Sequence, residues 1–284
     1  MPLPEWLKVK SKSNHQTKAI LREYNLHTVC EEARCPNQHH CFSKPVATFM
    51  ILGNHCTRNC GFCAVSHGLP LSPDPEEPLR IAKAVLAMGL RYVVITSVTR
   101  DDLEDGGAFH FAECIRSIRK ASPDVKMEVL TPDFQGNIDS LRKCLEALPD
   151  VFNHNLETIS RLYPVVRPQA NYDRSLFVLK SAKEIAPQVK TKSGLMLGLG
   201  EKMDEVLRLM DDLRAVGCDM LTIGQYMQPT KKNLPVVEYI SPEVFDELKE
   251  VALKKGFRYV ASAPLVRSSF NAEKHWHQAI DCYI

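Results

Sequence analysis

The stretch Cys56-Thr57-Arg58-Asn59-Cys60-Gly61-Phe62-Cys63 follows an apolar, strand-like run over residues 46–52. Its three cysteines have the spacing C-x3-C-x2-C. Thiolates are ligands of iron–sulfur clusters and of zinc, and short spacings let one loop surround one metal centre. Three thiolates on a four-iron cluster leave one iron open for a small molecule. The stretch therefore predicts a metal-binding loop, in which Gly61 lets the backbone come close to the cluster and Phe62 places a ring between two ligands.

Two other interpretations of this loop stay open. The offsets i, i+4 and i+7 also mark one face of a helix, so the cysteines could belong to a core. Asn54, Asn59, Gly53 and Gly61 favour a loop instead. A structural zinc site is the stronger alternative.

A second compact set of cysteines, Cys30, Cys35 and Cys41, lies fifteen residues before the first. Its spacing is C-x4-C-x5-C, and the segment shows no helical or strand period. Pro36 and the residue after it mark a turn. Packing alone explains such a set poorly, so it predicts a second metal site. Zinc is the alternative here too, with His39 or His40 as the fourth ligand.

The composition bounds the class of protein. The chain has 284 residues, 44% of them hydrophobic, which is enough for a large buried core. Its 36 basic and 34 acidic side chains give no electrostatic case for a nucleic-acid partner. No apolar run is long enough to span a membrane, and the N-terminus resembles neither a secretory signal nor a transit peptide. We therefore expect a cytoplasmic protein with reduced cysteines.

Strand and helix patterns alternate from residue 46 onward, which predicts an α/β fold with a parallel sheet. The predicted strands are 46–52, 92–97, 126–130, 151–155, 189–197 and 220–224. The predicted helices are 76–88, 109–120, 138–148, 174–185 and 204–216, preceded by a short helix at 17–23 and followed by a tail helix at 241–255 and a strand at 258–261. We expect Asp74 to be the N-cap of the helix at 76–88 and Ser241 to be the N-cap of the helix at 241–255. Cys114, Cys144 and Cys218 lie in or beside helices and read as buried thiols.

Polar groups and glycines follow the predicted strands. The segment from Thr96 and Ser97 to Gly106 and Gly107 suits a ligand that carries an ammonium group, although a solvated acidic loop is the alternative. The glycines near Gly198 would allow close approach of a flat group such as adenine. Carboxyl ends of parallel strands meet at one edge, so these groups are expected on one side of the sheet.

The cysteine loop resembles that of the radical S-adenosylmethionine (SAM) enzymes, with an aromatic residue before the third cysteine. The resemblance implies that Cys56, Cys60 and Cys63 hold a 4Fe–4S cluster whose open iron binds SAM. One electron then cleaves SAM to methionine and a 5′-deoxyadenosyl radical. It also implies a partial (β/α)6 TIM-type barrel over residues 46–240, with a cysteine-rich extension at 1–45 and a C-terminal extension at 241–284. The implied SAM contacts are Phe62, Thr96, Ser97, Gly106, Glu128, Asn153, Asn155, Gly198 and Tyr226.

Residues 96–107, 224–230 and 266–270 more narrowly resemble the lipoyl synthases. In that family an R-S-S-Y motif supplies a serine oxygen as the fourth ligand of a second 4Fe–4S cluster, held here by Cys30, Cys35 and Cys41. We expect Ser269 to be this ligand, with Ser268 as the alternative. Phe270 stands where the family has tyrosine, so any role of that hydroxyl is lost.

The resemblance implies insertion of sulfur at C6 and C8 of an octanoyl chain on a carrier lysine. The expected carriers are lipoyl domains of 2-oxoacid dehydrogenases or the glycine-cleavage H protein, the electron donor a ferredoxin or flavodoxin, and the enzyme a monomer. Another radical SAM reaction, a paralogue with a different carrier and a non-catalytic two-zinc module remain alternatives. The first would not explain both cysteine sets together with Ser268 and Ser269.

Overall fold

The computed structural model describes residues 2–8, 16–43 and 48–281. The chain divides into two compact units. The N-terminal unit consists of Lys10–Arg58 and Ala64–Phe152, and the C-terminal unit of Met1–Val9, Asn59–Cys63 and Asn153–Ile284. The boundary falls within the short strand β7 (Val151–Asn153). We describe each unit by itself.

The N-terminal unit contains a sheet in which β1, β2, β5 and β6 are neighbours in that order. Strand β2 runs parallel to β5, and β5 runs parallel to β6, whereas β1 is antiparallel to β2. The adjacent residues Val94 and Ile95 of β5 are both buried although they point to opposite faces, which is typical of a parallel sheet covered on both sides. The strand bounds are β1 His27–Thr28, β2 Thr48–Ile51, β3 His55–Cys56, β4 Ser66–His67, β5 Tyr92–Ser97 and β6 Lys126–Leu130.

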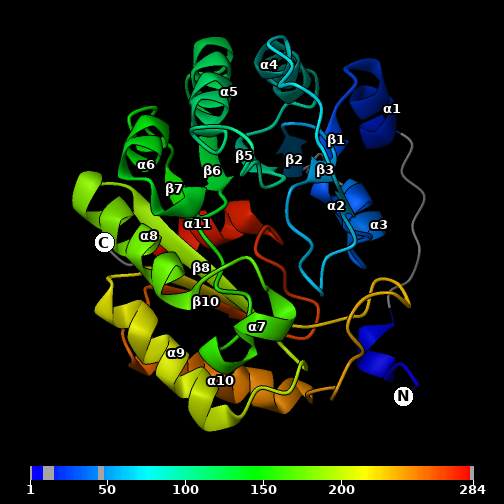
Figure 1. The fold of residues 1–284 in the computed structure, drawn as a ribbon, viewed down its shortest axis with the longest axis vertical. Coiled ribbons are helices and arrows are strands. Elements are labelled where there is room, and N and C mark those ends of the chain that lie inside the picture. Colours follow the sequence, from blue (N-terminus) through cyan, green and yellow to red (C-terminus); the bar gives the residue numbers. More distant parts are fainter. Residues whose placement is uncertain (1, 9–15, 44–47, 282–284) are drawn as a thin grey trace. The chain divides into compact units, whose positions relative to one another are not determined.

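Helices α4, α5 and α6 lie in a row in this unit, with α5 packed against both of the others (Figure 1). The helix bounds are α1 Gln16–Glu23, α2 Val29–Glu32, α3 Gln38–Phe42, α4 Glu77–Ala87, α5 Ala108–Ala121 and α6 Ile138–Leu145, with a 3-10 turn η2 at Phe134–Gly136. Asn137 caps α6 by accepting hydrogen bonds from the backbone of Asp139 and Ser140.

The start of α4 corrects one prediction. The helix begins at Glu77 and not after Asp74, and Pro78 occupies its first turn. Proline is favoured there because its missing N–H would have no partner. The Asp74 side chain instead accepts a hydrogen bond from the Glu76 backbone at 2.9 Å, which closes a turn before the helix.

Strands β8, β9 and β10 are neighbours in the C-terminal unit and run parallel. Helix α10 packs against β10, and Ser241 precedes its first residue, Pro242, as predicted. The element bounds are η1 Glu5–Leu7, η3 Ser160–Leu162, α7 Tyr163–Val166, α8 Tyr172–Ile185, β8 Lys190–Leu197, α9 Met203–Ala215, β9 Met220–Gln225, α10 Pro242–Lys254, β10 Tyr259–Ser262 and α11 Ala272–Asp281.

The predicted α/β class and all six strand–helix repeats are confirmed. The first strand is described from Thr48, because residues 46 and 47 lie outside the described ranges, and the fourth ends two residues earlier than predicted. The thiols of Cys114, Cys144 and Cys218 are fully buried, also as predicted. Among the described residues, no helix combines the length and the apolar character that crossing a membrane requires.

Candidate functional site

A strained turn leads from β2 into the cysteine loop. Leu52 has a φ of +67°, in the left-handed region that a leucine rarely adopts. Two side chains hold it there: the buried carboxylate of Glu77 accepts from the Leu52 N–H at 2.9 Å, and Arg100 donates to the Leu52 carbonyl at 3.3 Å. His110 contacts the same carboxylate at 2.7 Å. The direction in which the chain leaves β2 is thus fixed by groups on three other segments.

The sulfur of Cys56 receives two backbone hydrogen bonds. The N–H groups of Arg58 and Thr99 donate to Sγ at 3.4 and 3.3 Å. The two donors orient the sulfur, and hydrogen bonds to sulfur are among the features that tune iron–sulfur clusters. This donor set fits a cluster ligand at Cys56.

Thr57 fastens the loop to the segment that follows β5. Its N–H and its hydroxyl both donate to the Thr99 carbonyl at 3.0 Å, and the hydroxyl accepts from the Asp101 N–H at 3.1 Å. The polar segment after β5, which the sequence marked as a ligand site, therefore also supports the cysteine loop.

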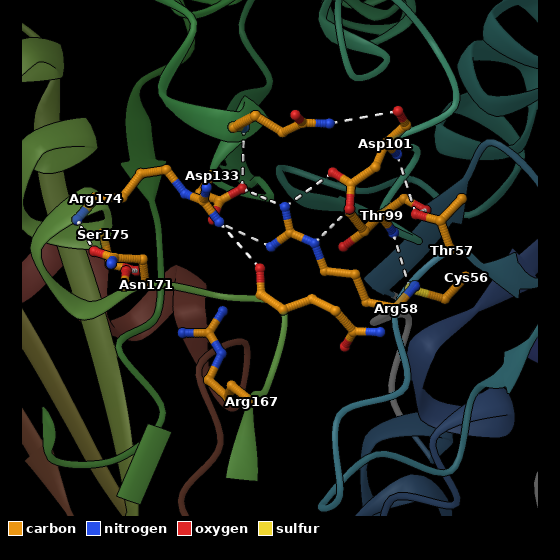
Figure 2. A network of polar contacts seen from close by, with 12 residues as sticks. Cys56, Thr57, Arg58, Thr99, Asp101, Asp133, Arg167, Asn171, Arg174 and Ser175 are labelled. Carbon is orange, nitrogen blue, oxygen red and sulfur yellow. Dashed lines mark hydrogen bonds and ion pairs between the residues drawn. The ribbon is translucent and has the colours of Figure 1, made fainter. Parts of the chain in front are cut away.

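Arg58 makes the strongest of these links (Figure 2). Its guanidinium donates to the Asp101 carboxylate at 2.6 and 2.9 Å and to that of Asp133 at 2.7 and 3.1 Å. The side chain of Arg58 is 5% exposed and that of Asp133 is fully buried. Burial alone would lower the pKa of Arg58, but hydrogen bonds to the two carboxylates outweigh it and raise that pKa. Such bidentate pairs are short and directional, so they fix the loop between its first two cysteines.

The second half of the loop belongs to the C-terminal unit. The Gly61 N–H donates to the Val166 carbonyl at 2.9 Å, and the Gly61 carbonyl accepts from the Leu234 N–H at 2.9 Å. A Cβ on Gly61 would lie 2.8 Å from the Leu234 side chain, so the absence of a side chain here makes room for Leu234. The approach of this backbone to a metal cluster stays a prediction. Asn233 donates to the Cys63 carbonyl at 2.7 Å. Cys60 and Cys63 are half-buried at the ends of this well-anchored turn.

Cys30, Cys35 and Cys41 lie near one another in the N-terminal unit. Burial raises the pKa of the Cys30 thiol, and the charges of Cys35 and Cys41 raise it further. A bound metal would lower the pKa of these thiols instead, because its positive charge favours the thiolates. Three neighbouring thiols with this mutual electrostatic effect fit a shared metal group.

The local structure around these cysteines differs from the prediction. Cys30 lies on α2 and Cys41 on α3, where only irregular chain was expected. These helices have four and five residues, too few to show a period. Among the described residues, no three His, Cys, Asp or Glu side chains converge on the position of a single ion. Thiolates of a four-iron cluster bind different irons and so need not converge in this way.

The implied SAM contacts of the N-terminal unit lie at the end of β5 (Thr96 and Ser97), in the middle of β6 (Glu128) and in the segment after β5 (Gly106). Thr96 donates to the Leu130 carbonyl at 2.9 Å, and the fully buried Glu128 accepts from the Tyr92 hydroxyl at 2.8 Å. The Ser97 hydroxyl is buried without a hydrogen-bond partner among the described residues. An unpaired buried hydroxyl costs about 1–3 kcal/mol, so it suits a position that a polar ligand completes.

A polar cavity of about 540 Å³ lies between the segment that follows β5 and the η2 turn. It includes Gly106, whose φ of +60° turns the chain toward Phe134. The cavity is lined by Asp101, Asp102, Leu103, Glu104, Gly106, Phe134, Gln135, Gly136 and Asn137.

The other implied SAM contacts lie in the C-terminal unit, where several have structural partners. Phe62 packs against a group of buried hydrophobic side chains that includes Tyr226. The Tyr226 hydroxyl donates a hydrogen bond to the Leu234 carbonyl at 2.7 Å. Burial raises the pKa of Tyr226 to about 12. Gly198 has a φ of +106°, and its N–H donates to Glu201 at 3.0 Å. Structural contacts therefore account for Tyr226 and Gly198 at least in part.

Asn153 and Asn155 are buried at the end of β7 and just after it. The amide of Asn155 donates to Glu157 at 3.0 Å, and its oxygen accepts from the Ser268 hydroxyl at 3.0 Å. Ser268 is thus engaged, whereas the Ser269 hydroxyl has no hydrogen-bond partner among the described residues. This difference leaves Ser269 available as a ligand.

Two family models match the chain. The radical SAM superfamily model matches residues 50–213, and the model for the N-terminal domain of lipoyl synthase matches residues 1–35. A lipoyl synthase of Alkaliphilus metalliredigens is 55% identical over 96% of both chains. One of Caldicellulosiruptor bescii is 57% identical over 95% of this chain and 94% of its own. The chain belongs to the lipoyl synthase family.

Solved structures show the same fold at low sequence identity. Streptococcus suis SuiB bound to its precursor peptide SuiA has a TM-score of 0.60 and 14% identity, over 87% of this chain and 52% of its own. Methylornithine synthase (PylB) has a TM-score of 0.54 and 13% identity, over 99% and 95%. The predicted radical SAM fold is confirmed, and with it a 4Fe–4S cluster and SAM as cofactors of the family.

The structure places two further residues, Arg58 and Lys192, beside the candidate site residues. The sequence analysis had not identified either of them. Arg58 lies inside the cysteine motif, yet its partners are 43 and 75 positions away and leave no local signal. Lys192 is a fully buried lysine in the middle of β8, with its ammonium 2.6 Å from the Ser268 carbonyl. A charged residue at the centre of a buried parallel strand is rare, and that signal could have found it.

Proposed function

We propose that this chain inserts two sulfur atoms, at C6 and C8, into an octanoyl chain carried on a lysine of a protein substrate. Carriers of the family are lipoyl domains in general, and we propose those of 2-oxoacid dehydrogenases or the glycine-cleavage H protein. A ferredoxin or flavodoxin would deliver electrons to the monomeric enzyme in the cytoplasm, where the thiols stay reduced. The observation that supports this function is the 55% sequence identity to a lipoyl synthase over 96% of the chain, together with both cysteine sets.

Two sets of residues would hold the two clusters. Cys56, Cys60 and Cys63 would bind the radical cluster, and Cys30, Cys35, Cys41 and Ser269 the auxiliary cluster that serves as sulfur donor. When bound, the first cluster and SAM supply a carbon radical that can remove hydrogen from an unactivated methylene. Such a C–H bond has no acidic proton, so an acid–base pair could not break it.

The residues of this chain prepare that chemistry in three ways. Backbone N–H groups of Arg58 and Thr99 orient the Cys56 sulfur, and the side chains of Arg58 and Thr57 hold the loop still. The unpaired hydroxyl of Ser97 would accept a hydrogen bond from the SAM ammonium group. Ser269 would supply a hard oxygen where iron prefers thiolate, so this ligand should leave readily when the auxiliary cluster gives up sulfur.

The serine assignment can be tested by three substitutions. Ser269→Cys should keep the auxiliary cluster, because thiolate is the softer and tighter ligand, yet lower the yield of dithiolated product about tenfold or more. Ser269→Ala should also lower this yield, whereas Ser268→Ala should have a much smaller effect. The measurement is dithiolated octanoyl-lysine peptide and 5′-deoxyadenosine per enzyme, with iron counted before and after turnover. A large loss in Ser268→Ala with full product from Ser269→Ala would move the ligand to Ser268.

A further inference from the structure

The segment that carries Ser268 and Ser269 connects β10 to α11 and is closely packed. The Pro264 carbonyl accepts from the Gln225 backbone at 3.0 Å, and the Phe270 N–H donates to the Arg267 carbonyl at 2.9 Å. A Cβ on Gly224 would lie 2.1 Å from the Val266 carbonyl oxygen. Only a glycine at the end of β9 therefore allows this segment to approach so closely.

Strand β8 supplies the other side of the contact. Lys192 and Gly194 are two positions apart and therefore point to the same face of the strand. A Cβ on Gly194 would lie 2.9 Å from the Ser268 hydroxyl, so the missing side chain makes room for this serine. On the same face, the ammonium of the fully buried Lys192 donates to the Ser268 carbonyl at 2.6 Å. Asn155 accepts from the hydroxyl of the same serine at 3.0 Å.

The contact to Lys192 acts on Ser269 as well. The Ser268 carbonyl belongs to the planar peptide group that joins the two serines, so holding its oxygen fixes the plane from which Ser269 projects.

We infer that Lys192 is the positioning residue for Ser269, because it orients the peptide group that precedes this ligand. This role rests on the proposed function, in which Ser269 holds the auxiliary cluster. Lys192 acts through Ser269 and its loop, and Asn155 secures the neighbouring hydroxyl. Replacement of the lysine should therefore weaken the hold of the protein on the auxiliary cluster.

The test uses the full chain with Cys56, Cys60 and Cys63 replaced by alanine, so that only the auxiliary cluster remains. After anaerobic reconstitution, Lys192→Met should release iron to a ferrous chelator about tenfold faster than this parent. Lys190→Met, on the same strand, is the matched control and should match the parent. With Ser269→Ala also present, Lys192→Met should change the release rate by less than about twofold, because both changes act on one ligand.

A second measurement needs no cluster. In the metal-free protein, Lys192→Met should accelerate amide hydrogen exchange in residues 266–270 about tenfold, and Lys190→Met should not. If Lys192→Met fails to fold, judged by its thermal unfolding midpoint, Lys192→Gln takes its place under the same criteria.

The outcomes separate the two ideas. The role of Lys192 is overturned if the parent and Lys192→Met release iron at the same rate. It is also overturned if Lys192→Met accelerates iron release equally with and without the Ser269 side chain. A parent that binds no iron overturns the proposed function instead, and hydrogen exchange then still decides whether Lys192 holds the loop.

Discussion

Alanine at Cys30, Cys35 and Cys41 is expected to stop formation of dithiolated product while reductive cleavage of SAM continues. The radical cluster keeps Cys56, Cys60, Cys63 and its open iron in this variant, so 5′-deoxyadenosine should stay within about threefold of the wild-type level. Loss of outer-shell contacts alone costs metal sites about 10- to 100-fold, so loss of three ligands should cost product more than about 100-fold. Mass spectrometry of an octanoyl-lysine peptide measures the dithiolated product, and chromatography measures the 5′-deoxyadenosine formed.

The matched control replaces three cysteines that lie outside both sets. Alanine at the buried thiols Cys114, Cys144 and Cys218 removes the same number of sulfurs but no proposed ligand. This control should retain about eight irons per chain, whereas the Cys30, Cys35 and Cys41 variant should retain about four. Dithiolated product at wild-type yield from the latter would remove the second set from the mechanism.

Replacement of Arg58 by methionine is expected to cause the largest loss of stability from a single substitution near the site. It removes the two hydrogen bonds that Arg58 donates to the fully buried carboxylate of Asp133. Breaking a buried ion pair from one side costs about 3–5 kcal/mol in the free energy of unfolding. The cysteine loop would also lose its link to Asp101, so SAM cleavage should fall as well. Chemical denaturation followed by circular dichroism measures the first effect.

Two further variants isolate the cause. Arg161→Met breaks a pair with Glu205 at an arginine whose side chain is 49% exposed, and it should cost less than about 1 kcal/mol. Adding Asp101→Asn and Asp133→Asn to Arg58→Met removes the uncompensated charges, so stability should largely return while SAM cleavage stays low. A triple variant that recovers SAM cleavage too would show that the arginine only balances charge and does not position the loop.

Strong local patterns made much of the fold predictable from sequence. Strands 92–97 and 126–130 were placed to the residue, because apolar runs bounded by turn residues define a buried strand well. Both cysteine sets were identified from their spacing, and the relatives confirm the family that they indicated. The α2 and α3 helices were missed because each is too short to show a period.

The contacts that position the site could not be predicted. Arg58 reaches Asp133 across 75 residues, and Lys192 reaches Ser268 across 76. Nothing in the local sequence of either residue names its partner. The Asp74 prediction failed because Asp74 and Pro75 form a reasonable helix start by themselves, while the real start is set by Pro78. Tertiary packing decided the partners of Arg58 and Lys192.

The source of the inserted sulfur tests the central claim most directly. The protein would be reconstituted anaerobically with iron and heavy-isotope-labelled sulfide, freed of excess sulfide, and given SAM, a reductant and an octanoyl-lysine peptide for one turnover. If the auxiliary cluster on Cys30, Cys35 and Cys41 is the donor, mass spectrometry will find the heavy isotope at both C6 and C8 of the product. Dithiolated product that carries only sulfur of natural isotopic composition, or SAM cleavage without any sulfur insertion, would contradict the account.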